Sequence, residues 1–202
     1  MDRIEEILEF WFGDTRRDIS CIPEWMSFWF AAGTDLDEPI RQRFTADVDA
    51  AASGQMKQWC ESAKGRLATI LLLDQFTRNI YRGKPEAFDN DDLALDLTQT
   101  GIVSGHDGKL SPVEMAFFYM PMQHAESLAV QMQSVALYEA LADTVPEATK
   151  KIFQNGFAHY ARLHRDIIVQ FGRFPHRNAI LGRESTPVEL AYLDGDAPTF
   201  GQ

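Results

Sequence analysis

The sequence predicts an all-α fold with about eight to ten helices. Apolar residues recur every three or four positions through most of its 202 residues, which is the spacing of one helix face. Prolines, glycines and capping residues stand at the ends of these periodic segments. No run of five residues alternates between polar and apolar side chains as a half-buried strand would. We expect one helical domain over residues 1–193 and a frayed tail over 194–202.

The first half of the chain divides into five predicted helices, placed by apolar spacing and by flanking Asp, Ser, Pro and Gly residues. They lie within residues 2–13, 23–33, 34–54, 62–79 and 85–101. In the second half, Ser111 and Thr186 each precede proline and then glutamate at the third helical position, which predicts two capping boxes. Thr144-Val145-Pro146-Glu147 is a variant of this pattern. Pro121 should break the helix that begins at Ser111, and further helices are expected to about residue 142 and over 146–171.

Composition excludes several classes of function. The chain has 30 acidic and 19 basic residues, a formal charge of -11, which argues against nucleic acids and anionic membranes as partners. No apolar stretch approaches the roughly 20 residues of a membrane span, and the acidic start is unlike a signal peptide. Cys21 and Cys60 are expected to be free thiols of a cytoplasmic protein. No nucleotide, zinc-protease or calcium-loop motif is present, so we expect no cofactor.

Basic residues are nevertheless clustered. Residues 65–84 carry a net +3 and residues 157–183 a net +4, which leaves -18 on the rest of the chain. Clustered arginine in an acidic protein is typical of sites that bind carboxylate or phosphate groups. The same arginines could instead pair with acidic helices elsewhere. The irregular segment Phe171–Asn178 adds Arg173, His176, Arg177 and Asn178 within six residues, either as part of a site or as a structural plug.

Polar residues also fall on apolar helix faces. Asp74 and Arg78 lie on the stripe of Leu67 and Leu71, where a carboxylate is costly unless it is paired. His164 lies in the middle of the apolar stripe of the helix over 146–171. A structural ion pair and a satisfied core histidine are the simpler interpretations. A binding or catalytic role for Asp74, His164 and His124 is the alternative.

A zinc or iron site is conceivable from four residues, but no pair of them has a spacing that demands a metal, and we predict none. The four are His124, Glu126, His164 and His176. The aromatic residues of the first 60 positions, which include four tryptophans, could form core or an exposed surface. A homodimer through these N-terminal helices is therefore an open alternative.

Four longer motifs resemble an uncharacterised bacterial family that is described as tetratricopeptide-repeat-like and as a domain of unknown function. They are Phe10–Gly13 (FWFG), Leu72–Gly83 (LLDQFTRNIYRG), Tyr119–Glu126 (YMPMQHAE) and Phe171–Asn178 (FGRFPHRN). The resemblance extends from Ile4 to Leu193. It implies a right-handed array of antiparallel helix pairs, and it implies no activity.

Three functions follow as hypotheses. The leading one is a pocket that binds a small anion or an acidic peptide end, with ligand-binding candidates Asp74, Arg78, Asn79, His124, Glu126, His164, Arg173, His176, Arg177 and Asn178. The second is an enzyme in the same pocket, in which His164 or His124 is the general base, Asp74 orients a partner and arginine stabilises an anion. The third is a scaffold that binds proteins along a tetratricopeptide-like groove.

Overall fold

The computed structural model describes residues 2–30, 35–195, 198 and 200, and these residues form helices without any strand. The helices are α1 (Arg3–Phe12), α2 (Ile22–Phe30), α3 (Asp37–Ala52), α4 (Ala63–Ile70), α5 (Thr77–Ile80), α6 (Asp91–Val103), α7 (Pro112–Phe118), α8 (Met120–His124), α9 (Leu128–Thr144), α10 (Glu147–Ile152), α11 (Ala158–Phe171) and α12 (Pro187–Leu193). The described part of the chain is thus all-helical, which confirms the all-α prediction.

Capping chemistry places most helix ends where the sequence predicts them. Both capping boxes are present, Ser111 with Glu114 and Thr186 with Glu189. Gly172 ends α11 in the left-handed conformation, with φ of 71°. The variant at Thr144 is wrong, because its hydroxyl donates back to the carbonyl of Leu141 inside α9 and Pro146 takes the cap position. The predicted ends at residues 33 and 34 lie outside the described residues.

Two helices pass through π-helical turns, which are rare and occur often at functional sites. One turn, Leu71–Phe76, joins α4 to α5, and the other, Phe153–Phe157, joins α10 to α11. In the first turn, successive carbonyl oxygens accept bonds from side chains of the following helical turn. The donors are Thr77 to Leu73 at 2.8 Å, Arg78 to Asp74 at 2.7 Å and Asn79 to Gln75 at 3.0 Å. This turn is therefore tied to polar side chains that the next section places at a cavity.

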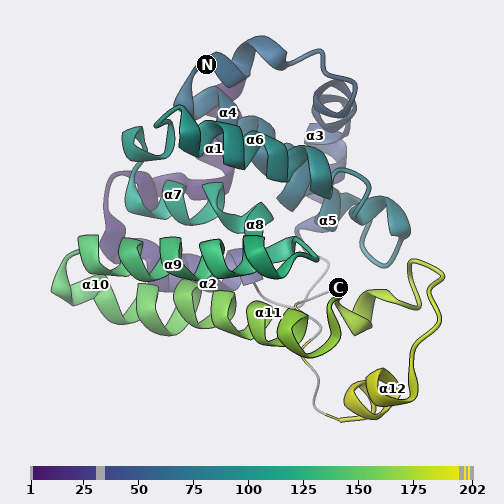
Figure 1. Ribbon diagram of the computed structural model, residues 1–202. Helices are drawn as coiled ribbons and strands as arrows, with labels where there is room; N and C mark the ends of the chain where they lie inside the picture. Colours follow the sequence, from purple (N-terminus) through teal and green to yellow (C-terminus); the bar gives the residue numbers. More distant parts are fainter. Residues whose placement is uncertain (1, 31–34, 196–197, 199, 201–202) are drawn as a thin grey trace.

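The chain is arranged as helical hairpins that pack on one another (Figure 1). After α9 the chain turns back, and α10 and α11 run along its length as the lower layer of the view. The helices α1, α4 and α6 make the upper part, and α7 and α8 lie between the two parts. The break between α7 and α8 at Tyr119 lies two residues before Pro121, as the sequence predicts.

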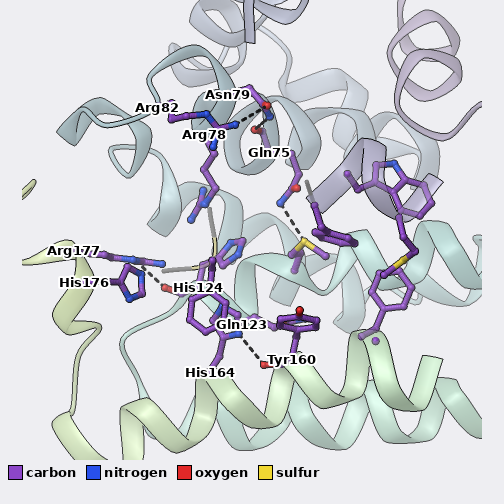
Figure 2. A pocket seen from close by; sticks show the side chains of 17 residues that line it. Gln75, Arg78, Asn79, Arg82, Gln123, His124, Tyr160, His164, His176 and Arg177 are labelled. Atoms are coloured by element: carbon purple, nitrogen blue, oxygen red, sulfur yellow. Dashed lines mark hydrogen bonds between the residues drawn. The ribbon is translucent and has the colours of Figure 1, made fainter. Parts of the chain in front are cut away.

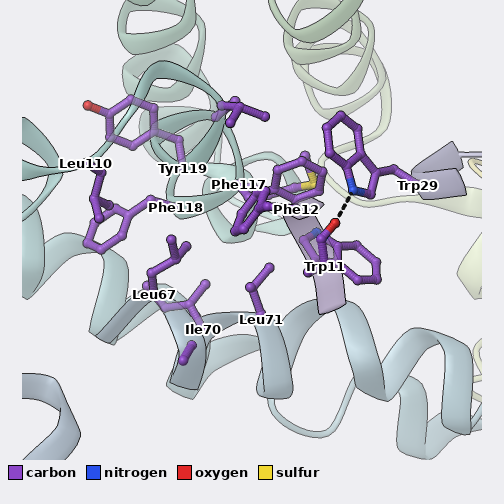
Figure 3. Packing of buried hydrophobic residues seen from close by; sticks show 14 of the residues in the cluster. Trp11, Phe12, Trp29, Leu67, Ile70, Leu71, Leu110, Phe117, Phe118 and Tyr119 are labelled. Atoms are coloured by element: carbon purple, nitrogen blue, oxygen red, sulfur yellow. Dashed lines mark hydrogen bonds between the residues drawn. The ribbon is translucent and has the colours of Figure 1, made fainter. Parts of the chain in front are cut away.

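The core is dominated by aromatic rings. Figure 3 shows Trp11, Phe12 and Phe117 packed between Trp29 and the α4 side chains Leu67 and Ile70. The indole N–H of Trp29 donates to the carbonyl of Trp11 at 2.8 Å, which fixes α2 against α1. Gly13 ends α1 at a φ of +48°, and a Cβ there would lie 2.1 Å from the Trp25 ring, so only glycine fits. The N-terminal aromatic residues are thus mostly core, although Phe30 is 47% exposed.

The end of the chain is only partly described. Of the predicted frayed tail, residues 196–197, 199 and 201–202 lie outside the described part, and Phe200 stacks on His164 with ring centroids 3.8 Å apart. Within the described ranges, no helix has both the length and the apolar character needed to cross a bilayer.

Candidate functional site

A cavity of about 220 Å³ opens between α2, the α4–α5 rod, α8 and α11. Both π-helical turns contribute to its wall, the first through Gln75 and the second through Gly156 and Phe157. Its polar lining residues are Gln75, Arg78, Asn79, Arg82, Gln123, His124, Tyr160, His164, His176 and Arg177, all labelled in Figure 2. Its other lining residues are Met26, Trp29, Phe30, Met120, Gly156, Phe157 and Phe200.

Asp74 lies directly behind this wall and is fully buried. One carboxylate oxygen is 2.6 Å from Nδ1 of His124 and 3.3 Å from a guanidinium nitrogen of Arg78. The other accepts a bond from the Gln75 amide at 2.6 Å. Burial raises the pKa of Asp74, but the guanidinium of Arg78, together with the hydrogen bonds from His124 and Gln75, holds that pKa well below its usual range. Asp74 is therefore ionised at neutral pH.

The ionised carboxylate fixes the tautomer of His124. Burial, followed by the nearby charge of Arg78, lowers the pKa of His124, so its imidazole is neutral at pH 7. A neutral ring beside a carboxylate must carry its proton on Nδ1, which donates to Asp74. The unprotonated atom is then Nε2, and it forms no hydrogen bond with any described residue. His124 thus brings a lone pair to the cavity.

His164 repeats this arrangement from α11. Its Nδ1 lies 2.8 Å from the carbonyl oxygen of Tyr160, one turn earlier, and must donate to it. Burial lowers the pKa of His164 strongly, and His124, whose ring centroid is 5.9 Å away, adds to the effect. His164 is therefore a buried histidine with one satisfied nitrogen, and its binding or catalytic role stays a prediction. Its ring is buried and lines the cavity.

Two arginines converge on one carboxylate beside the histidines. Nη2 of Arg78 donates to both oxygens of Asp91, at 2.9 and 3.1 Å, and Nη1 of Arg177 donates to the same carboxylate at 3.3 Å. Arg177 also donates to the backbone carbonyl of His124 at 3.2 Å, as drawn in Figure 2. Its guanidinium lies 4.5 Å from the ring centroid of Phe174. The network of Asp74, Arg78, Asp91, His124 and Arg177 therefore connects α4–α5, α6, α8 and the segment after α11; we call it the polar network.

Arg177 is the least compensated member of the polar network. It is 6% exposed, its Nε is buried without a hydrogen-bond partner, and Nη2 makes no hydrogen bond to the described residues. Burial lowers the pKa of Arg177 to about 10, with Asp91 opposing the shift and Arg78 adding to it. The guanidinium remains charged at neutral pH, yet shares its carboxylate with Arg78. A buried cation of this kind can accept a further anion.

The cavity surface is more basic than the network behind it. Three arginines and three histidines line the cavity, and none of its described lining residues is Asp or Glu. The acids that balance the arginines lie behind them: Asp74 and Asp91 for Arg78, and Asp37 for Arg82 at 2.8 Å. A ligand therefore meets hydrogen-bond donors and the faces of basic groups first.

Seven of the ten predicted site residues are brought together by the fold. Arg78, Asn79, His124, His164, His176 and Arg177 line the cavity, and Asp74 supports it from behind. Three others point elsewhere: Glu126 pairs with Arg183 at 2.6 Å, Arg173 with Glu189 at 2.6 Å, and the Asn178 amide donates to Ser185 at 2.9 Å. These three contacts hold the segment 172–189 in place.

Sequence reasoning did not identify Asp91, Arg82, Gln75 or the apolar wall from α2. Asp91 begins α6, within the helix predicted over residues 85–101. One signal in the sequence could have identified Asp91. A buried Arg78 that shares Asp74 with other groups requires a second carboxylate as a partner. No group of three or more His, Cys, Asp or Glu side chains among the described residues is arranged to hold a metal ion.

Comparison with known proteins gives a family without an established activity. A family of bacterial proteins of unknown function, DUF924, matches residues 7–197. The solved structure of a protein of unknown function from Agrobacterium tumefaciens is similar, with 36% sequence identity, a TM-score of 0.78 and coverage of 95% of this chain and 97% of that one. A search of curated proteins finds no match. The chain thus belongs to the DUF924 family of bacterial proteins.

Proposed function

We propose that the protein binds a small anion, or the acidic end of a peptide, in the cavity beside the polar network. The observation that carries this proposal is Arg177, a buried cation with unused hydrogen-bond donors that shares one carboxylate with Arg78. An anion within reach of Arg177 would complete its hydrogen bonding and add a counter-charge. The basic lining within a chain of net charge -11 supports the same conclusion.

The best test is calorimetric titration with acetate and with inorganic phosphate as probes. We expect at least one probe to bind and to raise the melting temperature, because binding to the native state stabilises it. Arg177→Met should abolish the effect. Arg17→Met is the matched control, since Arg17 is an exposed arginine that pairs with Glu9 and Asp14. The proposal would be contradicted if neither acetate nor phosphate binds, or if Arg177→Met and Arg17→Met bind the probe equally well.

A second candidate, an enzyme with His124 as general base, is favoured by one observation. Nδ1 of His124 lies 2.6 Å from a carboxylate oxygen of Asp74 and donates its proton to it. Nε2 is then unprotonated, and the buried carboxylate fixes the orientation of the ring, as a general base requires. Arg177 would then stabilise negative charge that develops on a bound anion. In this case His124→Gln should remove turnover of the bound compound and weaken its binding only modestly. Loss of binding and turnover in parallel would favour pure binding.

The scaffold hypothesis has less support from the site. A right-handed tetratricopeptide-like array, the groove that it would offer to a protein and a homodimer all remain predictions. The exposed residues Phe30 and Tyr160 both line the cavity, which supports a small ligand over a protein as the partner of that surface.

A further inference from the structure

We propose that the ligand is an organic monoanion with one apolar ring or short chain, bound with its carboxylate at Arg177 and its apolar part against α2 and α11. The proposal rests on the anion-binding function and names the chemical class of its ligand. It depends on how the cavity wall is divided, on how much charge is unbalanced and on how large the cavity is.

The cavity wall is divided into a basic and an apolar side. In Figure 2, Arg78, Arg82, Arg177 and His176 lie on one side. The apolar part of the wall comes from Met26, Trp29 and Phe30 of α2 together with Phe157. The apolar side is continuous, since the ring of Phe30 contacts those of Phe157 and Phe117 with centroids 6.2 and 6.0 Å apart. A phosphate ion or acetate would leave this side in contact with water.

Exposure of the apolar side points to an occupant. Phe30 and Tyr160 are 47% and 48% exposed although both belong to the cavity wall. Aromatic side chains that face a concave site are the usual lining of small-molecule pockets, together with a few placed polar groups. Phe200, stacked on His164, extends the apolar surface toward the histidines.

The charge of the wall and the size of the cavity further define the chemical class of the ligand. Arg78 has Asp74 and Asp91, and Arg82 has Asp37, so Arg177 is the arginine of this wall with the weakest carboxylate contact. One undercompensated cation suits a single negative charge, and the planar guanidinium suits a carboxylate. The cavity of about 220 Å³ is below the usual range of drug-sized pockets, so it suits one ring or a short chain.

The test is a set of calorimetric titrations with phenylacetate, acetate and benzyl alcohol as probes. We expect phenylacetate to bind at least about tenfold more tightly than either of the others, because it alone uses both sides of the wall. Phe30→Ser should weaken phenylacetate about tenfold and leave acetate unchanged, whereas Arg177→Met should weaken both acids. Val103→Ser is the control for losing an exposed apolar side chain, since Val103 is 90% exposed and outside this cavity.

The outcomes separate the two proposals. Equal affinity for acetate and phenylacetate, or an unchanged phenylacetate affinity in Phe30→Ser, would overturn the inference while the anion-binding function stands. Benzyl alcohol binding as tightly as phenylacetate, with no effect of Arg177→Met, would overturn both. If Phe30→Ser does not fold, hexanoate against acetate in the unaltered protein gives the same comparison, and equal binding of these two would again refute the apolar part.

Discussion

The aromatic core and the polar network meet on the α4–α5 rod, which contributes Phe76 to the core and Asp74 and Arg78 to the network, yet the two regions differ in how completely their buried polar groups are paired. In the aromatic core (Trp11, Phe12, Trp29, Phe44, Phe76 and Phe117) every ring is at most 8% exposed. In the polar network, burial is slightly shallower, with side chains up to 17% exposed, and bonding is incomplete. Of the seven buried side-chain atoms without a partner in the described chain, four lie in residues 176–183. Two of these four, Nδ1 of His176 and Nε of Arg177, belong to residues that line the cavity, whereas the aromatic core has one such atom, Nε1 of Trp11. Unpaired buried atoms are costly to fold, so their presence at the cavity favours function over stability there.

The largest expected effect lies in the aromatic core. Phe44 is fully buried and its ring contacts those of Phe10 and Phe76 at 5.0 and 4.8 Å. Phe44→Ala should lower the free energy of unfolding by about 4 kcal/mol through lost burial and a cavity. Phe44→Leu, as control, should cost about 1 kcal/mol. Urea denaturation measures both, and binding at the cavity should survive in the Leu variant. A cost below 1 kcal/mol for Ala would contradict this account of the core.

A somewhat smaller effect is expected at the fully paired member of the polar network. Asp74→Asn keeps the volume but leaves Arg78 and His124 without their shared carboxylate. We expect a loss of about 3 kcal/mol in urea denaturation, as for a broken buried ion pair. Asp92→Asn, an exposed neighbour of Asp91, should change stability by less than about 0.5 kcal/mol. Equal stability of the two variants would show that Asp74 is not a structural support.

Acid should weaken the polar network selectively. Burial, then Arg177, lowers the pKa of His176 to about 4, and the pKa values of His124 and His164 are lowered in the same direction. The unfolded chain protonates its histidines near pH 6.5, so it binds more protons than the folded protein between about pH 6.5 and 4. The free energy of unfolding should therefore fall as the pH falls through this window.

The pH effect has a matched pair of variants. His176→Gln removes one of the buried histidines and should make the fall in stability shallower, whereas His159→Gln, at an exposed position, should leave the slope unchanged. Chemical denaturation at pH 7, 6, 5 and 4 measures the slopes. A fall of the same steepness in both variants would rule out His176 as a contributor.

The smallest expected change in the free energy of unfolding is at Arg177. Whether this change is positive or negative tests most directly the contrast between the aromatic core and the polar network. Because burial lowers the pKa of Arg177, its charge is less favourable in the folded than in the unfolded state. Arg177→Met should therefore be neutral or stabilising by up to about 1 kcal/mol, while anion binding is lost. A destabilisation of more than about 2 kcal/mol in urea denaturation would mean that Arg177 is structural.

The fold could be predicted from the sequence more completely than the site, for physical reasons. Helix ends depend on local chemistry, so Ser111, Thr186 and Gly172 could be interpreted from their neighbours. The convergence of Asp74 with His124, 50 residues apart, depends on the packing of whole helices, although the position of Asp74 on an apolar face could be predicted. The apolar cavity wall from α2 could not be predicted. Aromatic residues that pack in a core and those that line a cavity recur along a helix with the same spacing. Arg173 and Arg177 are equivalent candidates in the sequence, and only the path of the segment after Gly172 directs one to Glu189 and the other to the polar network.

The π-helical turn Leu71–Phe76 determines which way the side chains after it on the same rod face around the helix axis. Its residues divide between the two regions: Phe76 joins the aromatic core, and Asp74 joins the polar network. Deleting a single residue there would turn Arg78, Asn79 and Arg82 by about 100° relative to the preceding core face. The length of this segment is therefore under tighter constraint than its composition, and a change that leaves every side chain intact could still dismantle the site.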